Sequence, residues 1–64
     1  MNGNIYWEAK AVCKDGAEIE RLFAYNDRRN DDEQQYDIEC WLLDRANELH
    51  GGATWFSVNI VIDD

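Results

Sequence analysis

The chain has 64 residues, of which 14 are acidic and six are basic, and its net charge is −8. Nucleic-acid phosphates and anionic membrane surfaces are bound by clustered Lys and Arg, so this composition argues against direct nucleic-acid binding and against membrane binding. A hydrophobic content of 45%, with three Trp, three Tyr and two Phe, is too high for a disordered acidic chain. We therefore expect one small domain over residues 1–64.

The chain carries no targeting feature, and its two cysteines are far apart in sequence. Met1–Asn4 lacks the charged and apolar regions of a secretion signal, and no apolar run approaches the roughly 20 residues of a membrane span. A cytoplasmic location is the resulting expectation. In that compartment Cys13 and Cys40 are expected to be reduced thiols.

Two strands and a tight turn are predicted in the first third of the chain. Residues 5–14 alternate between apolar and polar side chains, which is typical of a strand with one core face. That face comprises Ile5, Trp7, Ala9, Ala11 and Cys13. The dipeptide Asp15-Gly16 favours a hairpin, and residues 17–25 form the returning strand.

The apolar pattern also predicts the hairpin register. A two-residue turn would place Glu18 opposite Cys13, so the core face would meet an acid. A three-residue loop over Asp15–Ala17 instead pairs Cys13 with Ile19 and Trp7 with Tyr25, with a bulge at Gly16 or Ala17. This register leaves Arg21 as the one polar residue on the core face.

A helix is predicted from Asp31 to His50. Asn30, followed three residues later by Glu33, resembles a capping box, and Gly51 supplies a left-handed cap at the other end. The apolar residues recur at helical spacing, with Tyr36 at the margin of the stripe. The stripe comprises Ile38, Leu42, Leu43, Ala46 and Leu49.

Residues 54–62 alternate as a last strand, which completes the order β-β-α-β. Its core face comprises Phe56, Val58, Ile60 and Ile62. The predicted fold class is α+β: a three-stranded, mainly antiparallel sheet in the order 2-1-3, with one helix packed on one face. A parallel pairing of the last strand with the second strand stays open as the alternative.

Four carboxylates form what we call the acidic row: Glu33, Asp37, Asp44 and Glu48. At 100° per residue they fall within about 60° of one another and extend over about 22 Å of the helix. Trp41 flanks the row near its middle. The row is either a solvated outer face or a partner-binding surface, and Trp41 is either an interface anchor or a side chain folded over a sheet edge.

The sheet face without a helix is the second candidate surface. Tyr6, Leu22 and Trp55 lie there in the predicted alternation, among polar and charged side chains. One helix covers only one face, so these residues are either tolerated exposure or an interface with a second copy or another protein.

Catalytic, metal-binding and cofactor-binding patterns are absent from the sequence. His50, the only histidine, lies at the end of the predicted helix, where a cation stabilises the helix dipole. Neither cysteine has the paired spacing of a zinc site, and no glycine-rich loop precedes a helix. We therefore expect no enzymatic activity, no metal and no cofactor.

The function predicted from sequence is a non-enzymatic acidic module that binds a protein partner. The partner would be basic for the acidic row, and homodimerisation would use the open sheet face. The alternative is a nucleic-acid mimic that inhibits a nucleic-acid-binding protein. In size and charge the chain resembles small acidic inhibitors encoded by phages and mobile elements, and this resemblance involves no motif.

Overall fold

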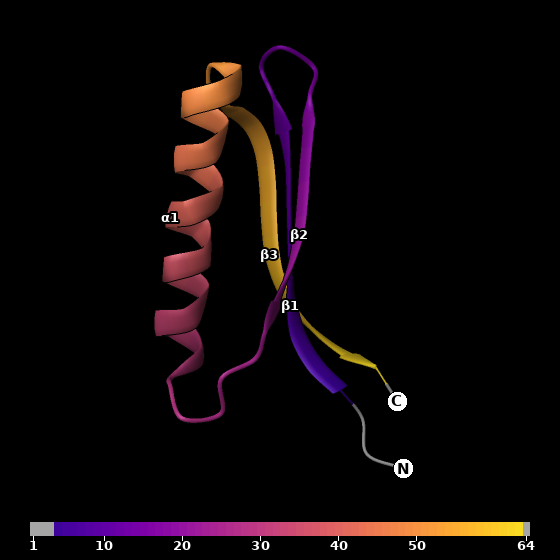
Figure 1. Cartoon of the computed structure of the whole chain (residues 1–64), viewed down its shortest axis with the longest axis vertical. Coiled ribbons are helices and arrows are strands. Elements are labelled where there is room, and N and C mark those ends of the chain that lie inside the picture. The colour runs from indigo at the N-terminus through magenta and orange to yellow at the C-terminus, as the bar shows by residue number, and fades with distance from the viewer. Residues whose placement is uncertain (1–3, 64) are drawn as a thin grey trace.

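The protein folds as one sheet covered on one face by one helix (Figure 1). The computed structural model describes residues 4–63, so most of Met1–Asn4, judged above for signal features, lies outside it. The elements are β1 (Asn4–Cys13), β2 (Glu18–Ala24), α1 (Asp31–His50) and β3 (Ala53–Asp63). The strand order is β2-β1-β3, and both pairs are antiparallel. The predicted fold class and strand order are confirmed.

The β1–β2 hairpin has a three-residue loop, but the predicted register is wrong by two residues. Trp7 lies opposite Phe23 and not Tyr25, and the loop spans residues 14–16. The Gly16 N–H donates to the Cys13 carbonyl, and Gly16 has φ +89°, so it occupies the bulge position. A shift of two residues keeps every side chain on its predicted face, and for that reason the alternation could not detect it.

The helix begins and ends where predicted, although its first turn is built differently. Asn30 is the N-cap residue, but its side chain accepts no capping hydrogen bond, so the predicted capping box is wrong. Its carbonyl accepts the Gln34 N–H instead. At the other end, Gly51 has φ +75° and forms the predicted left-handed cap, and the Gly52 N–H donates to the Ala46 carbonyl.

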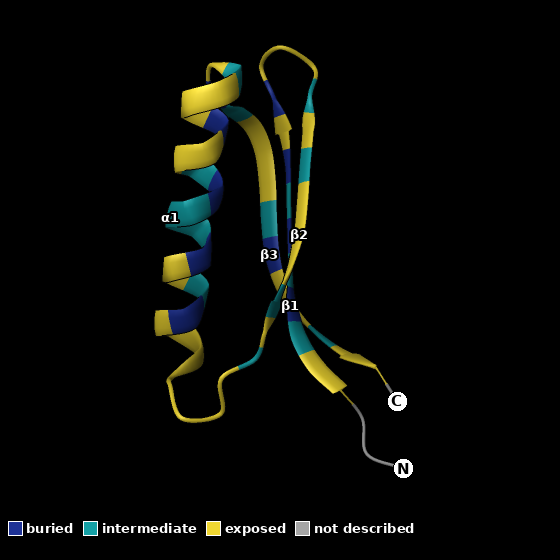
Figure 2. Ribbon diagram, in the orientation of Figure 1, coloured by how far each residue is buried: buried dark blue, intermediate teal, exposed yellow. Residues whose placement is uncertain are grey.

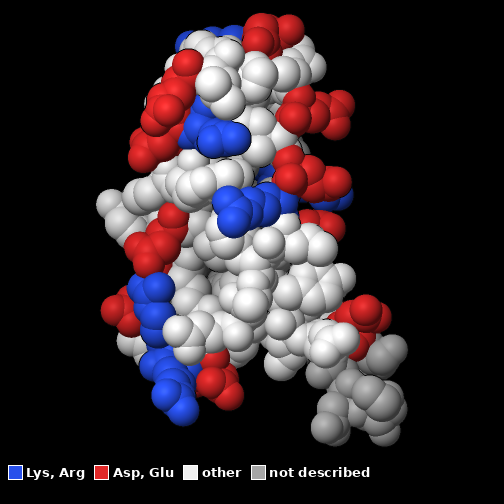
Figure 3. All heavy atoms as spheres, viewed as in Figure 1, with Lys and Arg blue, Asp and Glu red and all other residues white. Residues whose placement is uncertain are grey.

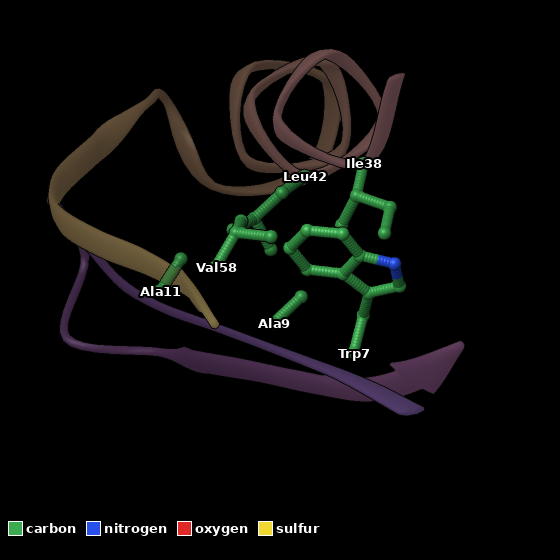
Figure 4. Packing of buried hydrophobic residues seen from close by; sticks show 6 residues of the cluster. All are labelled: Trp7, Ala9, Ala11, Ile38, Leu42 and Val58. Carbon is green, nitrogen blue, oxygen red and sulfur yellow. The ribbon is translucent and has the colours of Figure 1, made fainter. Parts of the chain in front are cut away.

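The core lies between α1 and the middle of β1 and β3 (Figure 4). Ala9 and Ala11 are small enough to let the helix approach the sheet closely, and Leu42 fills the space above them. The Trp7 ring lies beneath Ile38 and closes the end of the core nearer the start of the helix. The buried cluster comprises Trp7, Ala9, Ala11, Ile38, Leu42 and Val58.

Several residues predicted for the core are exposed, although they lie on the predicted face. These are Ile5, Leu49, Phe56, Ile60 and Ile62. The sheet twists, and the start of β1 and the end of β3 turn away from the helix (Figures 1 and 2). One straight helix covers only the middle of such a sheet, so its ends keep exposed apolar side chains. Residues 4–63 contain no helix that is both long and apolar enough to cross a membrane.

Candidate functional site

A groove runs between α1 and β2. The helix packs mainly over β1 and β3, so the inner side of the edge strand β2 is only partly covered. Two hollows of about 320 and 410 Å³ follow this line, and a third of about 210 Å³, lined by residues of α1 alone, adjoins them at Trp41. We call this feature the α1–β2 groove; its centre is lined by Arg21, Phe23, Trp41 and Arg45.

Trp41 forms the floor of the groove at its centre. Its ring meets Phe23 edge to face, with ring centroids 5.3 Å apart and an interplanar angle of 76°. Trp41 is half-buried and packs against the core cluster. Of its two sequence interpretations, the structure supports the side chain that folds over a sheet edge, and the same packing leaves part of the ring open to the groove.

Two arginines lie over this aromatic floor. The Arg21 guanidinium carbon is 4.7 Å from the Phe23 ring centroid and 4.9 Å from that of Trp41, while the Arg45 guanidinium carbon is 6.0 Å from Trp41. Among residues 4–63, neither arginine has a carboxylate oxygen within 4.0 Å. The stacking explains how Arg21, the polar residue on the core face of β2, is accommodated: its charge stays at the surface and its plane covers the rings.

Carboxylates line both margins of the groove (Figure 3). Asp44 and Glu48 border the hollow next to Trp41 on the helix side, and Glu18 and Glu20 border the groove on the β2 side. All four members of the acidic row are exposed; Asp37 lines the groove, and Asp44 and Glu48 line the adjoining hollow on the helix surface. The structure therefore brings these three together with Trp41.

One carboxylate of the row is already paired. The Arg29 Nη2 atom lies 2.6 Å from Asp37 Oδ2, and this hydrogen bond raises the pKa of Arg29. Both side chains are well exposed, so the pair contributes little to stability. It does close one end of the groove and reduces the charge that Asp37 offers to a partner.

Gln34 holds this end of the groove in place, and its role was not predicted from the sequence. The side chain is buried, and Oε1 accepts hydrogen bonds from the Trp7 indole at 3.0 Å and from the Asn26 N–H at 2.8 Å. Nε2 donates to the carbonyls of Asn26 and Arg29 at 2.8 and 3.1 Å. The helix position four residues before Ile38 could have indicated burial, but a glutamine there is polar and was not counted in the stripe.

The predicted residues of the open sheet face are not brought together. Tyr6 and Trp55 lie near opposite ends of the sheet, because Tyr6 pairs with Val61 while Trp55 pairs with Val12. Six residues of strand separate these rows, or about 20 Å. Lys10 lies between them, 3.8 Å from Glu8 and 3.6 Å from Glu20. Leu22 and Trp55 are 58% and 53% exposed, but charged rows separate the apolar side chains into two groups.

The histidine, cysteine and tyrosine side chains that could take part in catalysis contact neighbouring side chains or lie in the core. His50 Nδ1 lies 2.9 Å from Asp15 Oδ2. The N–H of Ala17 and the His50 contact hold the pKa of Asp15 below its ordinary value. Burial raises the pKa of the free Cys13 thiol, and the neighbouring Cys40 side chain raises the pKa of Tyr36.

Within residues 4–63 no three His, Cys, Asp or Glu side chains cluster as metal ligands would. Comparison of the chain with protein-family models, with curated proteins and with solved structures found no match. The α1–β2 groove is the best-defined candidate surface among the described residues.

Proposed function

We propose that the protein is a non-catalytic interaction module that binds a basic segment of a partner protein in the α1–β2 groove. The observation that carries the proposal is the arrangement of carboxylates along both margins of a groove whose floor is aromatic. Aromatic anchors next to complementary charge are typical of interaction hot spots.

The groove also specifies the chemistry of the segment. The hollow bordered by Trp7, Phe23 and Ile38 suits one large apolar side chain. Asp44 and Glu48 on one margin, and Glu18 and Glu20 on the other, lie beyond this hollow towards the end of α1 and suit Lys or Arg there. Arg21 and Arg45 lie over the floor between them and disfavour a cation at the centre. The expected segment therefore has a large apolar residue with basic residues on one side of it.

Selection from a library of random displayed peptides on the immobilised protein tests this proposal. We expect peptides with a large apolar residue and with Lys or Arg on one side of it, and binding that weakens at least about tenfold between low and high salt. Trp41→Ala and the double variant Asp44→Lys with Glu48→Lys should lose these peptides. The double variant Asp27→Lys with Glu39→Lys changes the net charge equally, away from the groove, and should retain them.

Peptides that bind all these variants equally would remove the groove from the proposal. Selected peptides without basic residues, or with affinities that do not change with salt, would contradict the stated chemistry.

The nucleic-acid mimic remains a second candidate because the whole acidic row is exposed on one side of the helix. A mimic would present its carboxylates to a phosphate-binding surface as an unbroken series. Here Arg29 pairs with Asp37, and Arg45 lies beside Asp44, which disfavours such a series. Competition with DNA for a basic DNA-binding protein, lost in the Asp37→Lys with Asp44→Lys variant, would favour the mimic.

A further inference from the structure

The two edges of the sheet differ in how they are protected. In β2, three of seven residues are charged, namely Glu18, Glu20 and Arg21, and charged edge residues prevent strands from pairing between molecules. In β3, which has 11 residues, the only charged residue is Asp63 at its end, and there is no proline. In a chain of net charge −8, β3 is thus an uncharged edge.

The alternation of backbone hydrogen bonds along β1 shows which N–H and C=O groups of β3 point away from β1. The Cys13 N–H donates to Ala17 on the β2 side, so the even-numbered residues of β1 direct their backbone groups towards β3. Their partners include Ser57 and Asn59. The residues between these partners therefore direct their N–H and C=O groups away from the sheet; they are Phe56, Val58, Ile60 and Ile62. In agreement, Gln35 Nε2 from the helix reaches the Val58 carbonyl at 3.4 Å, so this outward carbonyl already has one long side-chain contact and offers a further strand only its second lone pair.

The same residues carry the exposed apolar side chains of the helix-covered face. Phe56, Ile60 and Ile62 are 40%, 38% and 66% exposed. Free backbone groups and exposed apolar side chains thus coincide along one strand, which is the combination that strand addition uses.

We propose that a second copy of this chain pairs with β3 through its own β3, antiparallel, about a two-fold axis at Val58. The sequence of β3 is self-complementary in this register. Phe56 faces Ile60 of the second copy, Val58 faces Val58, and on the other sheet face Trp55 faces Val61 while Ser57 faces Asn59. The axis lies at the middle of Ala53–Asp63, so the whole strand is paired. An axis at Asn59 would instead oppose Trp55 with Asp63.

The helices fit this arrangement. Each helix lies over β1 and β3, so the two helices would be about two strand spacings, or roughly 10 Å, apart on the same face, within the usual helix-packing distance. Gln35 marks the flank of α1 that faces β3, and at 100° per residue Glu39 and the exposed Tyr36 lie further round the helix on that side, so the Glu39 side chains would keep to the solvent edge of the helix contact. The acidic row lies on the other flank, so the α1–β2 grooves of both copies would remain open.

The contact is small, which sets the concentration at which the dimer forms. A strand of 11 residues is about 37 Å long. With a sheet about 10 Å thick, the edges alone bury roughly 740 Å² in total, below the range of stable interfaces, before the helices add their contact. We therefore expect a reversible dimer in the micromolar to millimolar range.

Sedimentation equilibrium of the full chain up to about 1 mM tests the proposal, with folding of each variant checked by circular dichroism. Ile60→Pro removes an outward N–H without touching the β1 ladder and should weaken dimerisation at least about tenfold. Ile60→Glu, which leaves the backbone unchanged and opposes Phe56 with a charge, should do the same. Glu20→Pro, the equivalent change on the β2 edge, and Leu22→Lys, on the open sheet face, should dimerise like the wild type.

A wild-type monomer at 1 mM, or a dimer abolished by Leu22→Lys and unaffected by both Ile60 variants, overturns the proposal. Oxidative crosslinking then tests the register. A mixture of Ser57→Cys and Asn59→Cys proteins should give a disulfide-linked heterodimer, because these positions face each other at a separation that a disulfide spans. Crosslinks formed instead between two Ser57→Cys copies would place the axis elsewhere and overturn the pairing.

Discussion

Replacement of Gln34 by Leu should remove four hydrogen bonds from a domain that has little stability to lose. The Trp7 indole N–H is buried and would lose its acceptor, at a cost of about 1–3 kcal/mol. The three bonds to the backbone of Asn26 and Arg29 lie in an exposed loop where water replaces them, so each costs roughly 0.5 kcal/mol.

Burial of the leucine side chain returns about 1 kcal/mol, so the net loss in free energy of unfolding is roughly 2–3 kcal/mol. A domain of this size has about 3–10 kcal/mol in total. Urea denaturation followed by tryptophan fluorescence measures the difference. Gln35→Leu is the matched control: its side chain makes one long hydrogen bond, to the Val58 carbonyl, and its loss should cost less than about 0.5 kcal/mol. If the two variants are equally stable, Gln34 does not anchor the loop as described.

Two further predictions concern the turns. Asp15→Asn keeps the acceptor for the Ala17 N–H but removes the charge beside His50. Because the folded-state pKa of Asp15 is lowered, its carboxylate stabilises the fold above about pH 4 and loses this effect as the pH falls through the folded pKa. Urea midpoints of the wild type and Asp15→Asn should therefore converge in acid; a constant difference would contradict this. Gly51 has φ +75°, and a Cβ added there would meet no other atom, so Gly51→Ala should lower the free energy of unfolding in urea by about 1 kcal/mol through backbone strain alone. An unchanged urea midpoint would show that alanine is not strained at this position.

Local sequence patterns predicted the helix and the strands, since each element is bounded or marked by residues whose conformational preferences involve only their near neighbours in the chain. The Asp15-Gly16 turn, the glycine after His50 and the alternation in three segments are all signals of this kind. The order 2-1-3 was predicted with a parallel pairing of the last strand with the second left open, because either order places the apolar faces beneath the helix; the antiparallel β1–β3 pairing of the structure decides between them. The capping box was wrong although its residues were present, because side chains of the preceding loop and of Gln34 organise the first turn instead.

The candidate site was only partly predictable. Helical geometry placed Asp37, Asp44 and Glu48 on one side of α1, and the structure keeps them there. The same geometry could not show that this side adjoins β2, which depends on where the helix crosses the sheet. For the same reason Arg21, predicted as a polar misfit on the core face, could not be recognised as a cover for Phe23 and Trp41.

The sequence by itself determined the elements, their order and the face to which each side chain points, because these depend on periodicity and on the conformational preferences of single residues. The tertiary structure decided which of the hairpin registers two residues apart is adopted, since these place the same side chains on the same face. It also decided how much of the sheet the helix covers and what Trp41 contacts. A twisted sheet with one helix cannot bury all the apolar side chains on its inner face, and only the packing of α1 over β1 and β3 selects which remain exposed. That choice leaves a groove above β2 and an uncharged edge along β3.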